Sequence, residues 1–236
     1  MNEHQVVTPE HWLEARKRLL AKEKQFTRLR DELSQARREL PWVRVAKEYR
    51  FEGPQGSETL AQLFAGRSQL VVYHFMFAPD WDVGCKSCSF WADNFERNVV
   101  HLGARDVTLI AISRAPLAKI EAFRKRMGWT FKWVSSENTD FNFDYHVSFT
   151  PEALANGEIF YNYAWSKSSF PEQPGISVFY RDASGAIFHT YSCYGRGLDM
   201  MNVAYQYLDL VPMGRNEADQ GPNPQAWVRH RDNYGS

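Results

Sequence analysis

The sequence predicts an α/β fold, in which a central mixed β-sheet is flanked by helices and preceded by an N-terminal helical extension. Two apolar runs, at residues 69–77 and 107–112, predict parallel strands that are buried on both faces, and an amphipathic helix follows each of them. Residues 175–180 and 186–191 flank a turn at residues 182–185 and predict an antiparallel hairpin. This order joins a βαβ half to an antiparallel half, with helices on both faces of the sheet.

The predicted extension covers residues 1–42, and its helix covers residues 9–40. Thr8 can cap the helix, Pro9 suits its first turn and Pro41 ends the pattern. The apolar stripe is typical of a dimerising or partner-binding helix, which makes a homodimer possible. A solvated helix lying across its own domain is the alternative, favoured by Lys22 at one of the heptad positions. The apolar or small residues of the stripe are Leu19, Phe26, Leu29, Leu33, Ala36 and Leu40.

A single domain is predicted over residues 43–212, with an aromatic-rich insert at about 135–173 that could wall a hydrophobic cleft or pack over the sheet. The tail, residues 213–236, is rich in Gly, Pro, Asn and charge and is predicted to be loosely ordered. In the helix after the first strand, Cys88, Trp91, Ala92 and Phe95 share one buried face. Further helices are predicted at residues 57–64, 116–127 and 198–208, and a short strand at 130–134.

Composition narrows the functional classes. The chain has 236 residues, and its 28 basic residues balance its 28 acidic ones, so no net field favours nucleic acid or an anionic membrane. The longest apolar run is too short to span a bilayer. The first residues lack the pattern of a signal peptide, and three cysteines are too few for a disulfide scaffold. We therefore expect a cytoplasmic protein, with neither nucleic acid nor membrane as a partner.

Cys85 and Cys88 form a C-x-x-C pair where the first strong strand gives way to a helix. At a helix start, free N–H groups and the helix dipole stabilise a thiolate, and a second thiol one turn later is within disulfide reach. Lys86 adds positive charge. We therefore expect Cys85 to be the more exposed thiol with the lower pKa. Two incidental buried cysteines are one alternative. Zinc is another, but it requires four ligands and no second ligand pair of the usual spacing is present.

The order of elements around this pair resembles a thioredoxin fold, and the chain as a whole resembles the DUF899 family over residues 10–217. The resemblance implies a dithiol–disulfide oxidoreductase without cofactor or metal, acting on a disulfide-containing protein or a small thiol substrate. In ordinary thioredoxins Trp precedes the first cysteine and Gly-Pro separates the two; here Gly84 precedes Cys85, and Lys86-Ser87 lies between. The matching segments include VVYHFMFAPDWDVGCKSCSFWADNF, RDVTLIAISRAPLAKIEAFRKRMGW, PGISVFYRD and RGLDMMNVAYQYLDLVPMGR.

The resemblance also implies roles for two residues outside the pair. Pro174 stands just before a predicted strand, where thioredoxin folds place a cis-proline that faces the dithiol. His74, in the central strand, is a candidate for the buried group behind the second cysteine that assists proton transfer. A hydrogen-bonded core histidine is the alternative for His74, and Pro171 competes with Pro174.

Two further functions stay open. One is a peroxiredoxin-like thiol peroxidase, although the spacing between Pro79 and Cys85 does not match the peroxiredoxin motif. The other is a non-enzymatic binding module that keeps the fold. Cys193, after the hairpin, is either a third redox thiol or a small buried residue.

Overall fold

The computed structural model describes residues 4–218, 221 and 223–235. Contacts divide the chain into two units, Met1–Pro41 and Trp42–Ser236. The first unit holds one continuous helix, α1 (Pro9–Arg38), and no residue of this helix is buried. Thr8 caps it through a hydrogen bond from the His11 N–H to the Thr8 side chain, and Pro9 begins it. In the described part of the chain, no helix is both long enough and apolar enough to cross a membrane.

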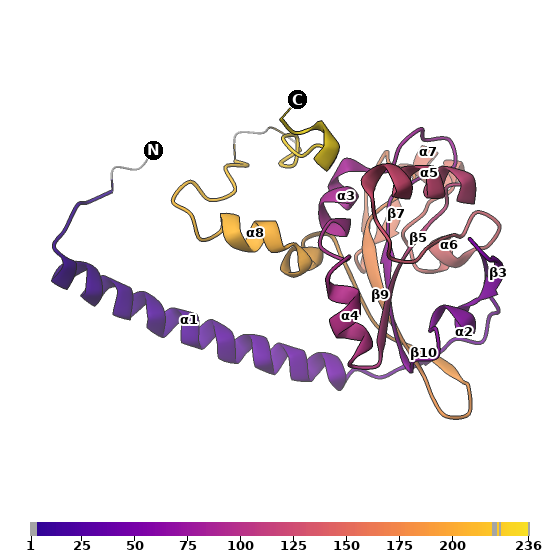
Figure 1. The fold of residues 1–236 in the computed structure, drawn as a ribbon, viewed down its shortest axis with the longest axis horizontal. Helices are drawn as coiled ribbons and strands as arrows, with labels where there is room; N and C mark the ends of the chain where they lie inside the picture. The colour runs from indigo at the N-terminus through magenta and orange to yellow at the C-terminus, as the bar shows by residue number, and fades with distance from the viewer. Residues whose placement is uncertain (1–3, 219–220, 222, 236) are drawn as a thin grey trace. The chain divides into compact units, whose positions relative to one another are not determined.

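The second unit is built on a mixed sheet. Among the described residues, eight strands form this sheet in the order β1-β10-β9-β4-β5-β6-β2-β3 (Figure 1). The strands of this sheet are β1 (Val43–Arg44), β2 (Arg50–Gly53), β3 (Gly56–Thr59), β4 (Gln69–His74), β5 (Val107–Ser113), β6 (Trp133–Ser135), β9 (Gly175–Arg181) and β10 (Ile187–Tyr194). A separate small hairpin joins β7 (Ile159–Tyr161) to β8 (Ala164–Ser166).

The order of the four central strands is that of a thioredoxin-like fold. Strand β4 pairs in parallel with β5, and the connection between them carries the C-x-x-C pair. On its other side β4 pairs antiparallel with β9, and β9 continues into β10 as a hairpin. His74, the last residue of β4, is aligned with Ile112 on one side and Gly175 on the other. The predicted α/β class and strand pairings are confirmed.

Helices cover both faces of the sheet. On one face, α3 (Lys86–Ala92), α5 (Leu117–Met127) and α8 (Val203–Leu208) contribute to a core with a high content of aromatic side chains. On the other face, α2 (Leu60–Leu63) and α6 (Phe141–Asp144) contribute to a second core. The remaining helices are α4 (Asn98–Gly103), α7 (Pro151–Ala155), and the 3₁₀ helices η1 (Gly195–Met201) and η2 (Arg231–Asn233).

Two predicted helices differ from the structure. Residues 57–59 belong to β3, and only α2 is helical in the predicted helix 57–64. The predicted helix 198–208 is split into η1 and α8 at Asn202, which caps α8 with its side chain. Glycine has a low helix propensity, and Gly195 has a left-handed φ of 52° at the start of η1.

The prediction of a loosely ordered tail is wrong for residues 223–235. Val228 is fully buried, and His230 is 9% exposed. Figure 1 shows this part of the chain, in yellow, beside α3. A few apolar and aromatic side chains anchor this otherwise polar stretch, and averaged composition does not reveal them. The tail therefore takes part in the core next to the C-x-x-C pair.

Candidate active site

The two thiols lie at the start of α3, in the connection that follows β4. Cys85 is the N-cap residue of α3, and its N–H donates to the carbonyl of Met76 at 3.1 Å. The Met76 N–H in turn donates to the Cys88 sulfur at 3.4 Å. Both cysteines are thus held against the same backbone residue just after β4. All three cysteines of the chain are thiols in this structure.

Burial and hydrogen bonding separate the two thiols. Cys85 is half-buried and Cys88 is fully buried. A hydrogen bond from the Cys88 thiol lowers the pKa of Cys85 to about 7, helped by the Ser87 and Cys88 backbone N–H groups and opposed by burial. Burial first, and then the interaction with Cys85, raises the pKa of Cys88 well above its ordinary value. The order of exposure and of pKa is the one predicted from the sequence.

Lys86, expected from the sequence to favour the thiolate through its positive charge, is hydrogen-bonded to the backbone. Its ammonium donates to the carbonyl of Ala226 at 3.0 Å. Hydrogen bonds from Cys88 and Ser87 lower the pKa of Cys85.

Gly84 is the residue that allows the loop to approach the core before Cys85. A Cβ atom on Gly84 would lie 2.8 Å from ring carbons of both Phe75 and Phe123, closer than packed carbons come. The Gly84 carbonyl is hydrogen-bonded to His230 Nε2 at 2.8 Å. The glycine before the first thiol is therefore explained by packing, since a tryptophan at this place would have no room.

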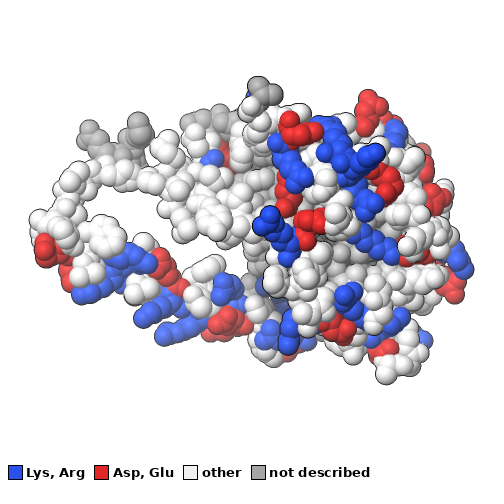
Figure 2. All heavy atoms as spheres, in the orientation of Figure 1, with Lys and Arg blue, Asp and Glu red and all other residues white. Residues whose placement is uncertain are grey.

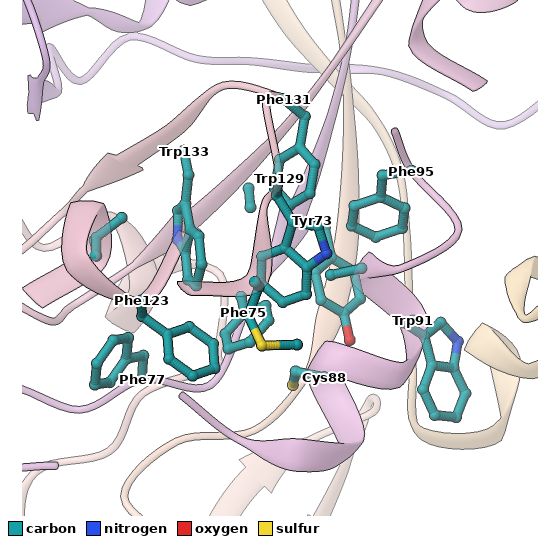
Figure 3. Close-up of a cluster of buried hydrophobic side chains, with 14 of the residues drawn as sticks. Tyr73, Phe75, Phe77, Cys88, Trp91, Phe95, Phe123, Trp129, Phe131 and Trp133 are labelled. Carbon is teal, nitrogen blue, oxygen red and sulfur yellow. The ribbon is translucent and has the colours of Figure 1, made fainter. Parts of the chain in front are cut away.

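The residue of β4 that faces Cys88 is Tyr73. Side chains alternate along a strand, so Tyr73 and His74 point to opposite faces of the sheet. Tyr73 belongs to the same buried cluster as Cys88, and its hydroxyl is hydrogen-bonded to the Cys88 thiol. Figure 3 shows the Tyr73 ring with its hydroxyl directed towards α3 and Cys88. No pattern in the sequence singled out Tyr73.

His74 is a core histidine on the other face. Its ring stacks on Tyr145, and its Nε2 is hydrogen-bonded to the Ser177 hydroxyl at 2.9 Å. The chain of contacts continues from Ser177 to Ser192 and from Ser192 to His189. Burial lowers the pKa of His74 to about 3, so the ring is neutral at physiological pH. The expected place of His74 behind Cys88 is wrong, and the alternative of a hydrogen-bonded core histidine describes it.

Pro174 is close to the dithiol, but its peptide bond is trans. The predicted cis bond is therefore wrong. Pro174 lines a cavity of about 200 Å³ together with Cys88, Tyr73 and Trp91. Its carbonyl accepts a hydrogen bond of 2.7 Å from the Tyr161 hydroxyl. Tyr161 lies in the aromatic insert, and no sequence motif marked it.

Cys193 is buried, and Arg114 is paired with a buried carboxylate. Cys193 is buried and aligned with Ile176, which is aligned with Tyr73, so it lies on the face of the sheet that carries Cys88. Arg114 forms an ion pair with the buried Glu172 at 3.2 Å. Within the residues that the structure describes, no group of three or more His, Cys, Asp or Glu side chains could hold a metal ion.

A family model described as "Bacterial protein of unknown function (DUF899)" matches residues 1–234. The chain belongs to the DUF899 family. Comparison of this DUF899 chain with curated proteins gave no match. Because the family is described as one of unknown function, the function has to be argued from the site itself.

Solved structures similar to the DUF899 chain include peroxiredoxins. Peroxidoxin BcpB from Mycobacterium tuberculosis matches with 12% identity and a TM-score of 0.47, covering 71% of this chain and 97% of its own. A mutant of peroxiredoxin Q from Xanthomonas campestris matches with 14% identity and a TM-score of 0.45, covering 67% and 90%. The mitochondrial 2-Cys peroxiredoxin from Plasmodium falciparum matches with 12% identity and a TM-score of 0.39, covering 71% and 92%.

Proposed function

We propose that this protein is a dithiol–disulfide oxidoreductase, with Cys85 as the nucleophile and Cys88 as the resolving thiol. The observation that carries the proposal is the placement of the two thiols: Cys85 is partly exposed at the start of α3, and Cys88 is buried one turn later. A hydrogen bond from Cys88 lowers the pKa of Cys85, whereas burial raises the pKa of Cys88. Cys85 is therefore the thiol that reacts as a thiolate near neutral pH, while Cys88 keeps its proton until the second step.

The proposed reaction has two exchange steps. The Cys85 thiolate attacks one sulfur of the substrate disulfide, forms a mixed disulfide and releases the other sulfur as a thiolate, which takes up a proton. Cys88 then loses its proton and attacks the Cys85 sulfur, which releases the second substrate thiol. The substrate gains two electrons and two protons, and the protein is left with a Cys85–Cys88 disulfide. An external dithiol reductant returns the pair to thiols.

Tyr73 and Pro174 have supporting roles in this proposal. Tyr73 is a positioning residue, because its hydroxyl can donate to the Cys88 sulfur as that sulfur loses its proton. Pro174 contributes its ring to the cavity beside Cys88. It has no N–H, and its carbonyl is bound by Tyr161, so it contacts the substrate through its apolar surface.

Single-cysteine variants and two activity assays test the proposal. Reduction of insulin disulfides and of a small disulfide is measured beside peroxide consumption. We expect reduction of the small disulfide by the wild type, none by Cys85→Ser, and a trapped mixed disulfide on Cys85 in Cys88→Ser. Peroxide consumption without disulfide reduction would replace the proposal with a thiol peroxidase. Inactivity in both assays, together with a stable protein complex, would favour a binding module.

The proposal includes the reducing cytoplasm as the compartment. A catalytic dithiol must return to its thiol form between turnovers, and reductant systems that do this are found there. On the visible face Lys and Arg are interleaved with Asp and Glu (Figure 2), which fits a disulfide substrate better than a polyanion.

A further inference from the structure

The C-terminal segment, residues 223–235, holds the chain on both sides of Cys85. His230 Nε2 is hydrogen-bonded to the Gly84 carbonyl at 2.8 Å, one residue before the thiol. The Lys86 ammonium donates to the Ala226 carbonyl at 3.0 Å, one residue after it. The segment is therefore fixed to both neighbours of Cys85.

Packing and ion pairs anchor this segment to the domain. The Trp227 ring packs edge-on against Phe90 of α3, with ring centroids 5.5 Å apart. Asp232 forms a bidentate ion pair with Arg126 of α5, with hydrogen bonds of 2.7 and 3.0 Å. Arg231 lies 3.3 Å from Asp93. The C-terminal segment is thus attached to α3, which carries the dithiol, and to α5.

One residue of the segment, Gln225, lines the cavity at Cys88. This cavity, of about 200 Å³, is smaller than ordinary ligand pockets of roughly 300–1,000 Å³. Its inner lining is apolar, with Tyr73, Trp91 and Leu198 around the sulfur. A neighbouring cavity of about 270 Å³ has a charged lining. The two cavities share Arg196, Asp199 and Gln225, the last of which belongs to the C-terminal segment.

We propose that the C-terminal segment restricts the dithiol to small-molecule disulfides that combine an apolar group with a polar end. This inference rests on the proposed function and adds the substrate class. The apolar group enters the cavity at Cys88, and the polar end lies near Arg196 and Gln225. A disulfide on the surface of a folded protein reaches Cys85 more slowly while the segment is attached. The exchange steps and the dithiol reductant are those given above.

The test compares two substrates in variants that loosen the segment. The substrates are bis(2-hydroxyethyl) disulfide and insulin, and the variant His230→Ala removes the bond to Gly84. We expect kcat/KM for insulin to rise about tenfold while kcat/KM for the small disulfide stays within about twofold. Asp232→Asn, at an exposed position, should shift the ratio in the same direction with less risk to folding. His101→Ala, an exposed histidine on α4, is the matched control and should change neither rate.

A second readout does not depend on turnover. The reduced protein is alkylated with iodoacetamide and with a maleimide-coupled polyethylene glycol, and modification of Cys85 is followed by mass spectrometry. We expect the wild type to react much faster with the small reagent and His230→Ala to narrow that difference. The substrate restriction is overturned if neither variant changes the ratio of the two alkylation rates or the ratio of kcat/KM for the two disulfides. If neither disulfide is reduced but the alkylation ratio narrows, the proposed function fails and the access role of the segment stands.

A separate observation concerns α1. Every seventh residue from position 12 onwards is large and apolar, and each of these side chains is at least 43% exposed. A seven-residue apolar repeat of this length is the pattern of a coiled coil. The positions three residues further on are Ala15, Lys22, Leu29 and Ala36, of which only Leu29 is large and apolar. The large residues are Trp12, Leu19, Phe26, Leu33 and, just after the helix, Leu40.

We infer that α1 pairs with α1 of a second copy of this chain in an antiparallel coiled coil. A parallel pair in register would bring Lys22 against its own copy. An antiparallel pair places it against the partner's Leu33, over which its methylene stem can lie. The same arrangement brings Glu23 towards the partner's Arg30. It also brings Arg16 towards the partner's Arg37, and repulsion between these like charges offsets part of the attraction.

The oligomeric state tests this second inference. Sedimentation equilibrium should give a dimer for the wild type and for Leu20→Glu, which lies outside the seam, and a monomer for Phe26→Glu. A monomeric wild type, or a Phe26→Glu variant that stays dimeric, overturns it. In a background with the native cysteines replaced by serine, Ala36→Cys should not form an interchain disulfide. Such a disulfide would contradict the antiparallel direction, because it requires the two copies of residue 36 to face each other.

Discussion

Cys85 and Cys88 are the same residue type within one turn of helix, yet their surroundings shift their pKa values in opposite directions. The difference comes from where each sulfur lies. Cys85 at the helix start receives hydrogen bonds from Cys88 and Ser87, whereas Cys88 is buried under Tyr73 and the aromatic core (Figure 3). The division of labour between nucleophile and resolving thiol follows from these local contacts.

The pH dependence of Cys85 alkylation tests this account. We expect the rate to follow a titration with a midpoint at about pH 7, since only the thiolate reacts. Cys88→Ala removes the hydrogen bond that contributes most to stabilising the thiolate, so the pKa of Cys85 rises and the midpoint moves to higher pH. Cys88→Ser keeps a donor and should move it less. Equal midpoints for the Ala and Ser variants would contradict the role of the Cys88 hydrogen bond.

Replacing Tyr73 with phenylalanine tests the positioning role. Tyr73→Phe removes the hydroxyl that contacts Cys88 and keeps the buried ring. One such hydrogen bond to a charged group is worth about 1.5 kcal/mol, so resolution of the mixed disulfide should slow about tenfold. Formation of the mixed disulfide at Cys85 should change little. Tyr207→Phe, at an exposed position, is the control, and equal slowing of both steps would point to a general structural effect instead.

The packing at Gly84 gives a third prediction at this scale. Gly84→Ala places a Cβ against Phe75 and Phe123, so the free energy of unfolding should fall by about 1–3 kcal/mol in urea denaturation. Gly103→Ala is the matched control, because its Cβ meets only the flexible guanidinium of Arg67. Its effect should stay within about 0.5 kcal/mol. If Gly84→Ala leaves the free energy of unfolding unchanged, the loop before Cys85 has room for a Cβ atom, and packing does not explain the glycine.

Among the elements, the C-terminal segment contributes most beyond the predicted domain. Val228 is fully buried, so Val228→Ala should lower the free energy of unfolding by about 2 kcal/mol. Val211→Ala, at a position that is 47% exposed, should have almost no effect. If both variants are equally stable, the segment does not belong to the folded core.

The elements that the sequence predicts best are those whose whole length is apolar. The interiors of strands β4 and β5 have this character, the β9–β10 hairpin is marked by its turn, and the i, i+3 spacing alone brings Cys85 next to Cys88. Residues 223–235 show the opposite case, because Val228 and His230 act as single anchors in a polar stretch. Single anchors leave no periodicity to detect.

Within the site, the misplacement of His74 has a similar cause. A shift of one residue along a strand moves a side chain to the other face, so an alignment across a loop of unknown length can exchange Tyr73 and His74. The role of Tyr161 depends on the hydrogen bond from its hydroxyl to the Pro174 carbonyl, and no motif marks Tyr161. The isomer of the bond before Pro174 is equally a matter of tertiary context.

For the molecule as a whole, the division into two units predicts independent folding. Both apolar cores are formed by residues of the second unit, and α1 contributes no buried residue. A chain that starts at Trp42 should therefore keep its circular dichroism in the near ultraviolet and its thermal midpoint. The full chain and the shortened chain are compared at a low protein concentration, where pairing of α1 is weak. A shortened chain that fails to fold would show that α1 is needed for the core.

The bond between His230 and the Gly84 carbonyl has a practical consequence for anyone who purifies this protein. An affinity tag or a fluorescent fusion joined directly after residue 235 would stand close to the histidine that fastens the chain beside the reactive sulfur. A bulky fusion there pulls on this fastening and alters the apparent preference for one disulfide over another. Tags are therefore better attached ahead of α1, and rates measured with carboxyl-terminal fusions should be repeated after the fusion is cleaved off.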